Sequence, residues 1–383
     1  MNKSKKMHCA VVGAKGYSGQ QLCQLLLAHP GFQVCGVFSR SKAWRLPIAP
    51  QLPVWPTEQL AEKCQQIELL FLATPAEVSA ELIPIALAAG VKVIDLSGAC
   101  RLPDGQHQRW YPGVLRYDEI LNQVQDDTGL SQDDTGLSQG DTGLSQGDTC
   151  TPYVIPAAEP GSKSNGKQVV YGLQPFCQQQ LNADTALIAN PGCYATAAQM
   201  ALVPLAKAGC LQEVTITIDA KSGVSGAGKK ASESLLFCEL SDNFYPYKIG
   251  KHQHTPEIEN SLSHFAGQPI SLLLTTQLLP VVRGIAMTIY LNKAFDPKQL
   301  AAAYQADYQD YPLVQTAHLP ELSAEQQAQF LGLTSVTHTP NTHIGYQVVG
   351  EQTLLFVTLD NLMKGAASQA IENAECLLTG EAV

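Results

Sequence analysis

A cysteine at the predicted start of a helix is the strongest chemical signal in this sequence. Residues 190–196 have the sequence NPGCYAT, after an apolar run at 186–189 and before an apolar stretch, 197–208, that ends at Gly209. A strand, a Pro-Gly turn and a helix would put Cys193 at the helix N-terminus. We expect the partial positive charge there to lower the pKa of Cys193 and favour a nucleophilic thiolate, the alternative being a buried structural cysteine.

Two histidines form the second chemical motif, within KHQHTPEI at 251–258. Thr255 and Pro256 are typical of the N-cap and first position of a helix, so His252 and His254 would lie just before it. Histidine titrates near neutral pH, and we expect one of the pair to be the acid or base that serves Cys193. The alternatives are a solvated histidine pair and a His-x-His metal site, for which no further ligand motif is evident.

A glycine-rich loop, GAKGYSG at 13–19, lies between an apolar run at 8–12 and a stretch with helical apolar spacing at 20–28. Strand, glycine loop and helix are typical of dinucleotide-binding domains, in which a pyrophosphate rests on the helix N-terminus. A plain turn uses the same residue types. The expected cofactor contacts from this loop are Gly13, Gly16, Tyr17, Ser18 and Gly19.

The end of the second predicted strand, residues 32–38, favours NADP over NAD. An NAD site places an acidic residue there, whereas this sequence has Ser39 and Arg40. Arginine can bind a 2′-phosphate through two parallel hydrogen bonds, although a solvated surface arginine is the alternative.

Further strands are predicted at 67–73 and 91–96, with a helix at 76–89 between them. Alternating apolar strands and helices predict an α/β fold with a doubly wound, parallel, Rossmann-type sheet. Ligands gather at the carboxyl ends of such strands, which adds Thr74, Pro75 and Ser97 to the expected cofactor contacts.

The alternation of apolar strands and helices ends after Gly209. β-Branched strands at 214–218, 270–276, 284–291 and 353–359 predict an α+β domain with a mixed sheet and helices on one face. The C-terminal helix, 361–378, is expected to pack back on the first domain. We therefore expect an NADP-binding domain at 1–190, completed by 361–379, and a catalytic, substrate and oligomerisation domain at 191–360.

Two further features of this second part could bind anions. Residues 222–229, SGVSGAGK, form a plausible anion nest or a simple flexible loop. Arg283 is a candidate for binding a carboxylate or phosphate group of the substrate.

Composition narrows the possible partners and location. The 383 residues carry a net charge of −10 without a long basic run, which argues against nucleic acid and anionic membranes. Eleven cysteines without regular spacing or a secretory signal favour the reducing cytoplasm. Residues 127–149 repeat the unit DTGLSQ with a seven-residue period and predict a flexible surface insertion rather than a calcium-binding repeat.

Together, the cysteine, the histidines, the NADP-type loop and the anion-binding groups predict a specific chemistry. A Cys193 thiolate attacks an acyl phosphate, phosphate leaves, and NADPH reduces the thioester to an aldehyde. Backbone N–H groups at the helix start can stabilise the oxyanion.

These motifs resemble those of the N-acetyl-γ-glutamyl-phosphate reductase family of arginine biosynthesis, whose relatives are aspartate-semialdehyde dehydrogenases. The matching segments span nearly the whole chain in the family's order: 13–19, 95–97, 190–196, 222–228, 252–258, 283–284, 360–362 and 364–366. The resemblance implies a thioester on Cys193, a histidine of the 252/254 pair as acid or base, and a homodimer or homotetramer. It implies NADP(H) on the glycine loop, Ser39, Arg40 and Asn361.

The family likeness sets our remaining expectations for the site. We expect Ser222 and Gly223 to contact the cofactor, and the substrate contacts to be Arg101, Asn190, Ser225, Gly226 and Arg283. The sequence departs from the family in DLSGACRL at 95–102, where an acid is lost, and in YGLQP at 171–175, where a glutamate is lost. The competing functions are a sister reductase acting on aspartyl or carrier-bound aminoadipyl phosphate, and a non-catalytic NADP-binding regulator.

Overall fold

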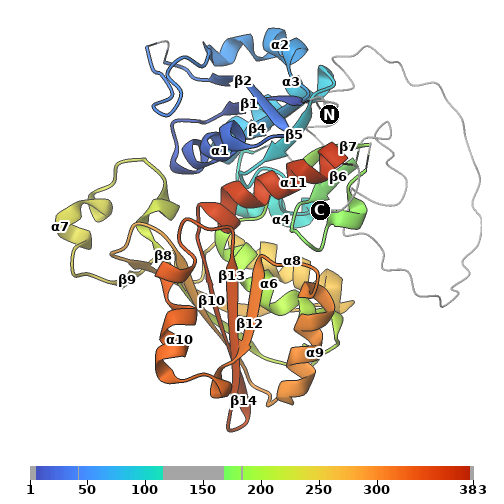
Figure 1. The fold of residues 1–383 in the computed structure, drawn as a ribbon, viewed down its shortest axis with the longest axis vertical. Helices are drawn as coiled ribbons and strands as arrows, with labels where there is room; N and C mark the ends of the chain where they lie inside the picture. The colour runs from blue at the N-terminus through green and yellow to red at the C-terminus, as the bar shows by residue number, and fades with distance from the viewer. Residues whose placement is uncertain (1–5, 42, 115–167, 183, 380–383) are drawn as a thin grey trace, which may run out of the picture.

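Two sheets of seven strands each, joined through a shared set of helices, make up the protein (Figure 1). The computed structural model describes residues 6–41, 43–114, 168–182 and 184–379. The repeat at 127–149, predicted to be a flexible insertion, lies outside the described residues. The α/β architecture predicted from the sequence, a Rossmann-type parallel sheet followed by a mixed sheet, is confirmed.

The first sheet is entirely parallel, with the order β3-β2-β1-β4-β5-β7-β6. Its strands are β1 (Met7–Val12), β2 (Phe32–Phe38), β3 (Val54–Trp55), β4 (Leu69–Leu72), β5 (Lys92–Asp95), β6 (Gln168–Tyr171) and β7 (Thr185–Ala189). The helices that follow these strands are α1 (Tyr17–Ala28), α2 (Leu60–Lys63), α3 (Ala76–Ala88) and α4 (Asp104–Trp110). All four side chains of β4 are buried, because helices cover both faces of the sheet.

The second sheet is mixed, with the order β12-β13-β14-β11-β8-β10-β9. Its strands are β8 (Ile216–Gly223), β9 (Tyr245–Pro246), β10 (Leu272–Leu279), β11 (Ile285–Leu291), β12 (Val314–His318), β13 (Thr342–Val349) and β14 (Gln352–Leu359). Two pairs of neighbours, β8 with β10 and β12 with β13, are parallel, and the others are antiparallel. The helices of this half are α6 (Cys193–Lys207), α7 (Phe237–Leu240), α8 (His254–Ala266), α9 (Pro297–Tyr308) and α10 (Ala324–Leu331).

Helices cover one face of the second sheet more completely than the other. Along β8, Ile216, Ile218 and Ala220 are buried in a core shared with α6, α8 and α9, whereas the intervening side chains are only partly buried. The sequence predicted helices on one face of this sheet, and α6, α8 and α9 lie on one face. Helix α10 is an addition, because it also contacts β13 and β14. In the view of Figure 1, α10 lies on the opposite side of the sheet from α9.

The chain returns to the first sheet after β14. Residues Met363–Ala367 form a π-helical turn, and α11 (Ser368–Thr379) continues from it. Side chains of α11, among them Ala370 and Ala374, share a core with α1 and the strands β1, β2 and β4. The turn therefore lies where the two sheets meet, close to the start of α6. None of the helices within the described residues is both long and apolar enough to span a lipid bilayer.

Candidate active site

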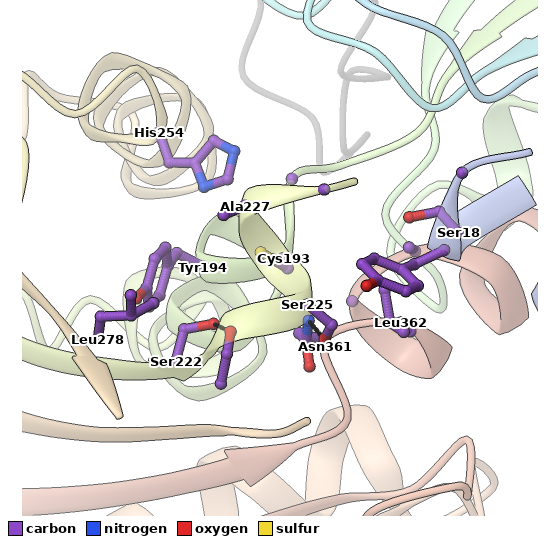
Figure 2. A pocket seen from close by; sticks show the side chains of 18 of the residues that line it. Ser18, Cys193, Tyr194, Ser222, Ser225, Ala227, His254, Leu278, Asn361 and Leu362 are labelled. Carbon is purple, nitrogen blue, oxygen red and sulfur yellow. Dashed lines mark hydrogen bonds between the residues drawn. The ribbon is translucent and has the colours of Figure 1, made fainter. Parts of the chain in front are cut away.

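One cavity of about 630 Å³ lies between the two halves of the protein. The first half contributes the glycine loop, and the second half contributes the start of α6, the loop after β8 and the start of α8; the segment that follows β14 closes the wall. Figure 2 shows Ser18, Cys193, Ser225, His254 and Asn361 around this space. Residues from distant parts of the sequence therefore meet at one site.

Cys193 is the first residue of α6, as predicted, with Gly192 at the N-cap. Its side chain is partly exposed and lines the cavity. The π-helical turn packs against it from the other side, because a Cβ atom added to Gly365 would lie 2.8 Å from the Cβ of Cys193. The nucleophile is thus fixed between its own helix and a backbone segment that begins 170 residues later in the chain.

The predicted lowering of the Cys193 pKa is wrong for the protein without ligands. Burial raises the pKa of the thiol to about 11, and the charge of Glu257 raises it further. The N–H of Tyr194 and the charge of Arg101 lower it, but they do not offset the loss of hydration. Cys193 is therefore a thiol at neutral pH until a base removes its proton.

Both histidines of the predicted pair line the cavity and are buried. The Nδ1 atom of His252 accepts the backbone N–H of His254 at 3.2 Å, which leaves the proton of neutral His252 on Nε2. The His254 ring lies on Gly192, where an added Cβ would be 2.1 Å from Nε2. Helix α8 begins at His254 rather than after it, so Thr255 and Pro256 belong to its first turn instead of capping it.

Burial keeps both imidazoles neutral at neutral pH. It lowers the pKa of His252 to about 3 and that of His254 well below its usual range, and the charge of Lys248 lowers both. A neutral imidazole is the form that can accept a proton from a thiol. Within the described residues, no three His, Cys, Asp or Glu side chains gather in a way that could hold a metal ion.

Glu257 connects the two motifs and is not among the site residues expected from the sequence. It is 1% exposed, and its Oε1 accepts the N–H of Gly192 at 2.8 Å and the hydroxyl of Tyr171 at 2.7 Å. Its Oε2 lies 3.7 Å from Arg101 Nη1 and 4.0 Å from His254 Nε2. The only local signal was an acid in the first turn of a helix; its contact with the cysteine turn depends on packing between α6 and α8.

The expected substrate contacts separate into two groups. Arg101, Ser225 and Gly226 line the cavity, whereas Asn190 is buried beneath it. Arg101 donates from Nε to the carbonyl of Asn190 at 2.8 Å. The Asn190 side chain bonds to the carbonyl of Ala366 at 3.3 Å, which makes it a support between the cysteine turn and the π-helical turn.

Arg283 lies outside this cavity. It pairs with Asp360 at 3.3 Å and donates to Gln21 of α1 at 2.8 Å, beside a separate cavity of about 150 Å³. Arg283 is therefore not in a position to bind the same ligand as Cys193.

The expected cofactor contacts also divide into two groups. The residues that line the cavity are Gly16, Tyr17, Ser18, Gly19, Ser222, Gly223 and Asn361. The residues that follow the strands without lining it are Gly13, Ser39, Arg40, Thr74, Pro75 and Ser97. A dinucleotide fits the first group, because α1 has no acidic residue in its first turn and its N-terminus faces the cavity.

Glycine is required at two positions of this loop. Gly13 has φ +87°, and an added Cβ would lie 2.2 Å from the carbonyl oxygen of Ala73. A Cβ added to Gly19 would lie 2.3 Å from the carbonyl oxygen of Gly13. These close approaches form the tight cradle that a pyrophosphate needs.

The first departure from the family pattern has a structural counterpart. A Cβ added to Gly98 would lie 2.1 Å from the hydroxyl oxygen of Tyr111, so the tyrosine fills the space beside the backbone. At the second departure, the buried Gln174 donates to Asn373 of α11 at 3.1 Å. Both changed segments are thus packed into the protein.

The chain is similar to known proteins over nearly its whole length. Residues 8–196 match the semialdehyde dehydrogenase NAD-binding domain, and residues 193–361 match the semialdehyde dehydrogenase dimerisation domain. The chain is 33% identical over 381 residues to the N-acetyl-gamma-glutamyl-phosphate reductase of Bacillus mycoides (strain KBAB4), which covers 97% of this chain and 95% of the relative.

Solved structures share the fold at low sequence identity. The complex of aspartate semialdehyde dehydrogenase II with ASA from Vibrio cholerae superimposes with a TM-score of 0.62 at 18% identity, covering 98% of this chain and 99% of the other. The Candida albicans enzyme with NADP has a TM-score of 0.56 at 13% identity, covering 97% and 98%. Fold, motifs and sequence identity agree: the chain belongs to the N-acetyl-γ-glutamyl-phosphate reductase family of semialdehyde dehydrogenases.

Proposed function

We propose that this protein reduces N-acetyl-γ-glutamyl phosphate with NADPH, yielding N-acetylglutamate 5-semialdehyde, phosphate and NADP⁺, as a step of arginine biosynthesis. One observation carries the proposal. Cys193 begins α6 inside a cavity that also contains two neutral histidines and the glycine loop of a dinucleotide-binding domain. An enzyme that forms and reduces a thioester needs this combination of groups.

Cys193 starts the reaction by transferring its proton to one imidazole of the 252/254 pair. The His254 ring adjoins the cysteine turn, and His252 is held in one tautomer by the backbone. The sulfur then attacks the acyl carbon, and backbone N–H groups at the start of α6, which has no side-chain cap, stabilise the oxyanion. The tetrahedral adduct expels phosphate, which leaves with the electrons of the carbon–oxygen bond, and a thioester remains on Cys193.

NADPH, when bound, supplies the hydride that reduces this thioester. Gly16–Gly19, Ser222, Gly223 and Asn361 are the residues we propose to hold it. The imidazole pair returns the proton as the thiohemiacetal collapses to the aldehyde, and Cys193 is restored. Because Asn361 donates to Ser225 at 3.0 Å and accepts the N–H of Gly284 at 2.8 Å, its side chain keeps a fixed position beside the cofactor.

NADP rather than NAD is proposed because Ser39 and Arg40 stand where an acidic residue would select NAD. Arg40 is exposed at the end of β2, so its guanidinium is accessible to a 2′-phosphate. Replacing Arg40 with Ala should raise the KM for NADPH more than the KM for NADH.

We also propose that the protein works as a homodimer or homotetramer in the reducing cytosol. The match of residues 193–361 to a dimerisation domain supports self-association. The less covered face of the second sheet supports it too, since Leu273 and Tyr290 are 56% and 39% exposed there.

Phosphate-dependent reduction of NADP⁺ with N-acetylglutamate semialdehyde tests the function. The wild type should be active, and Cys193→Ser should lose at least about 10³-fold in kcat, because a serine hydroxyl cannot replace the thiol as nucleophile. Cys238→Ser, which changes an exposed cysteine outside the cavity, is the matched control. Greater activity with aspartate semialdehyde, or an active Cys193→Ser variant, would contradict the proposal.

A further inference from the structure

A buried glutamine of the cysteine helix has no part in the reaction proposed above. Gln199 follows Cys193 in α6 by less than two helical turns. Gln199 and its apolar neighbours Ala198 and Met200 are each 0% exposed. Leaving a buried amide without a partner is costly, so the hydrogen bond that Gln199 makes is the first indication of its role.

The amide of Gln199 determines the direction of the Tyr171 hydroxyl. Gln199 Nε2 donates to the hydroxyl oxygen at 2.8 Å, whereas Gln199 Oε1 has no hydrogen bond within the described residues. A phenol has one proton, and a hydroxyl oxygen that accepts from an N–H keeps that proton for another acceptor. The acceptor is Oε1 of Glu257, 2.7 Å from the hydroxyl oxygen. The sequence of donors therefore runs from Gln199 through Tyr171 to the carboxylate.

The carboxylate oxygen that accepts from Tyr171 also holds the cysteine turn. Glu257 Oε1 accepts the N–H of Gly192, the N-cap of α6, at 2.8 Å. Its Oε2 lies 3.7 Å from Arg101 Nη1 and 4.0 Å from His254 Nε2. One donor would leave the carboxyl group free to rotate, whereas two donors from different segments fix which oxygen faces His254.

Tyr171 reaches this network from the first half of the protein. It is the last residue of β6, it pairs in register with Ala189 at the end of β7, and it is 2% exposed. Its side chain does not line the cavity. The hydroxyl therefore joins the carboxyl edge of the parallel sheet to α6 and α8, the helices that carry Cys193 and His254.

We propose that Tyr171 is a positioning residue for the reaction, and that Gln199 supports it. The hydroxyl holds the Glu257 carboxylate against the cysteine turn and keeps its second oxygen beside His254. The inference rests on the proposed function, in which a proton passes from Cys193 to an imidazole. A hydrogen bond to a charged acceptor is about twice as strong as one between neutral groups, so the hydroxyl fixes the carboxylate firmly. Misplacing the carboxylate slows the chemical step without removing a group that binds substrate.

The alternative is a hydroxyl that only stabilises the fold. The Tyr171 ring packs in the core shared with α6 and α8, so part of its contribution is structural on either view. Tyr304 offers a matched comparison, because it is 1% exposed and donates its hydroxyl to the carbonyl of Ala201 in α6 at 3.0 Å. Tyr171→Phe and Tyr304→Phe each remove one buried hydroxyl that contacts this helix. They differ in that the Tyr171 hydroxyl also binds Glu257.

The test is the reverse reaction of the full-length enzyme, with phosphate, N-acetylglutamate semialdehyde and NADP⁺ varied separately. We expect Tyr171→Phe to lower kcat at least about tenfold and to leave all three KM values within about threefold. Tyr304→Phe should keep kcat within about twofold of the wild type, although it also loses a buried hydrogen bond. Gln199→Met, which keeps the tyrosine and removes only its support, should lower kcat about threefold.

A double-mutant cycle decides whether Tyr171 acts through Glu257. In the Glu257→Gln background the charge that the hydroxyl positions is already absent. Adding Tyr171→Phe to that background should therefore lower kcat by no more than about twofold. A hydroxyl that acts only on the stability of the fold would lower kcat by the same factor with and without the carboxylate.

Each contrary result has a distinct meaning. An active wild type with an unchanged kcat in Tyr171→Phe overturns the role of the hydroxyl; if that variant does not fold, an unchanged kcat in Gln199→Met overturns it instead. Equal losses in both Glu257 backgrounds, or in Tyr171→Phe and Tyr304→Phe, also overturn it and assign the hydroxyl to stability alone. A wild type without phosphate-dependent activity overturns the proposed function, and this inference with it.

Discussion

Two buried charged clusters lie near the start of the cysteine helix, and they are built differently. Glu257, which accepts the N–H of Gly192, is 1% exposed, and its Oε2 has ion-pair neighbours but no hydrogen bond within the described residues. Lys364, on the π-helical turn, is 0% exposed. Its ammonium donates to Glu372 at 2.8 Å, to the Tyr311 hydroxyl, and to the carbonyl of Gln174 at 3.4 Å.

The difference lies in what each charged group contacts. Both clusters contain buried atoms without hydrogen bonds in the described part of the chain, Glu257 Oε2 and His254 Nδ1 in one and Glu372 Oε1 in the other. Glu257, however, neighbours Arg101 and His254, which line the cavity, whereas the three donors of Lys364 have acceptors that lie outside it. We infer that the Glu257 cluster serves the reaction and the Lys364 cluster serves the fold.

Replacing Glu257 with Gln should have the largest effect on catalysis. The carboxylate holds the N–H of Gly192 and faces both Arg101 and His254, so the variant disturbs the turn that carries Cys193 and the charge beside it. We expect kcat/KM to fall about 10²- to 10³-fold, about 2.7–4 kcal/mol in the activation barrier. Steady-state kinetics on folded protein, checked by circular dichroism, measures this.

Glu259→Gln is the control for that variant. Glu259 lies on the same helix and accepts the N–H of Leu272 at 3.1 Å, away from the cavity. Its kinetics should stay within about twofold of the wild type. Equal losses in both variants would mean that Glu257 acts only through the stability of α8.

Replacing Lys364 with Met should change stability far more than catalysis. The variant leaves Glu372 and the Tyr311 hydroxyl without their buried cation, and breaking a buried ion pair costs about 3–5 kcal/mol. Chemical denaturation should show this loss, while kcat/KM of the folded protein stays within about threefold. A catalytic loss as large as that of Glu257→Gln would end the distinction between the two clusters.

A more exposed ion pair provides the control for Lys364. The side chain of Lys207 is 39% exposed and that of its partner Asp307 is 10% exposed, whereas Lys364 is fully buried. Lys207→Met should therefore lose less stability than Lys364→Met.

The pH dependence of Cys193 alkylation gives the smallest effect and refines the comparison. Only the thiolate reacts with iodoacetamide, and the pKa of Cys193 is raised to about 11, so the rate in the unliganded wild type should climb about tenfold per pH unit up to that range. Glu257 raises this pKa, so Glu257→Gln should move the midpoint downward, whereas Lys364→Met should leave it in place. A rate that is already constant at neutral pH would contradict the raised pKa; peptide mass spectrometry separates Cys193 from the exposed Cys238.

The sequence alone predicts those helices and strands whose formation depends on residues that are neighbours in the chain. Buried parallel strands are continuous apolar runs, so β4 and β5 were predicted within two residues of their bounds, and the Pro-Gly turn placed Cys193 at its helix start. Strands β12 and β13 were missed, because THIGYQVV mixes polar residues and a glycine into a strand that is defined by its pairing with β14. The signal that could have found β13 is the hairpin to β14 at Gly350, which has φ +58°.

The properties of the site depended on segments far apart in the chain. The helix start alone predicts a lowered pKa for Cys193, but burial of the thiol, together with the smaller effect of the Glu257 charge, raises it instead. Arg283 has the residue type of an anion ligand, yet contacts with Gln21 and Asp360 hold it outside the cavity. Neither outcome can be read from residues that are neighbours in the sequence.

The contact between Gly192 and His254 makes the evolution of two distant motifs interdependent. The imidazole occupies the volume that any side chain at 192 would need, since an added Cβ would lie 2.1 Å from its Nε2. A Gly192→Ala substitution should therefore force the His254 ring to move, and its effect should be smaller where position 254 carries a small side chain. Substitutions at these two positions are expected to be non-additive.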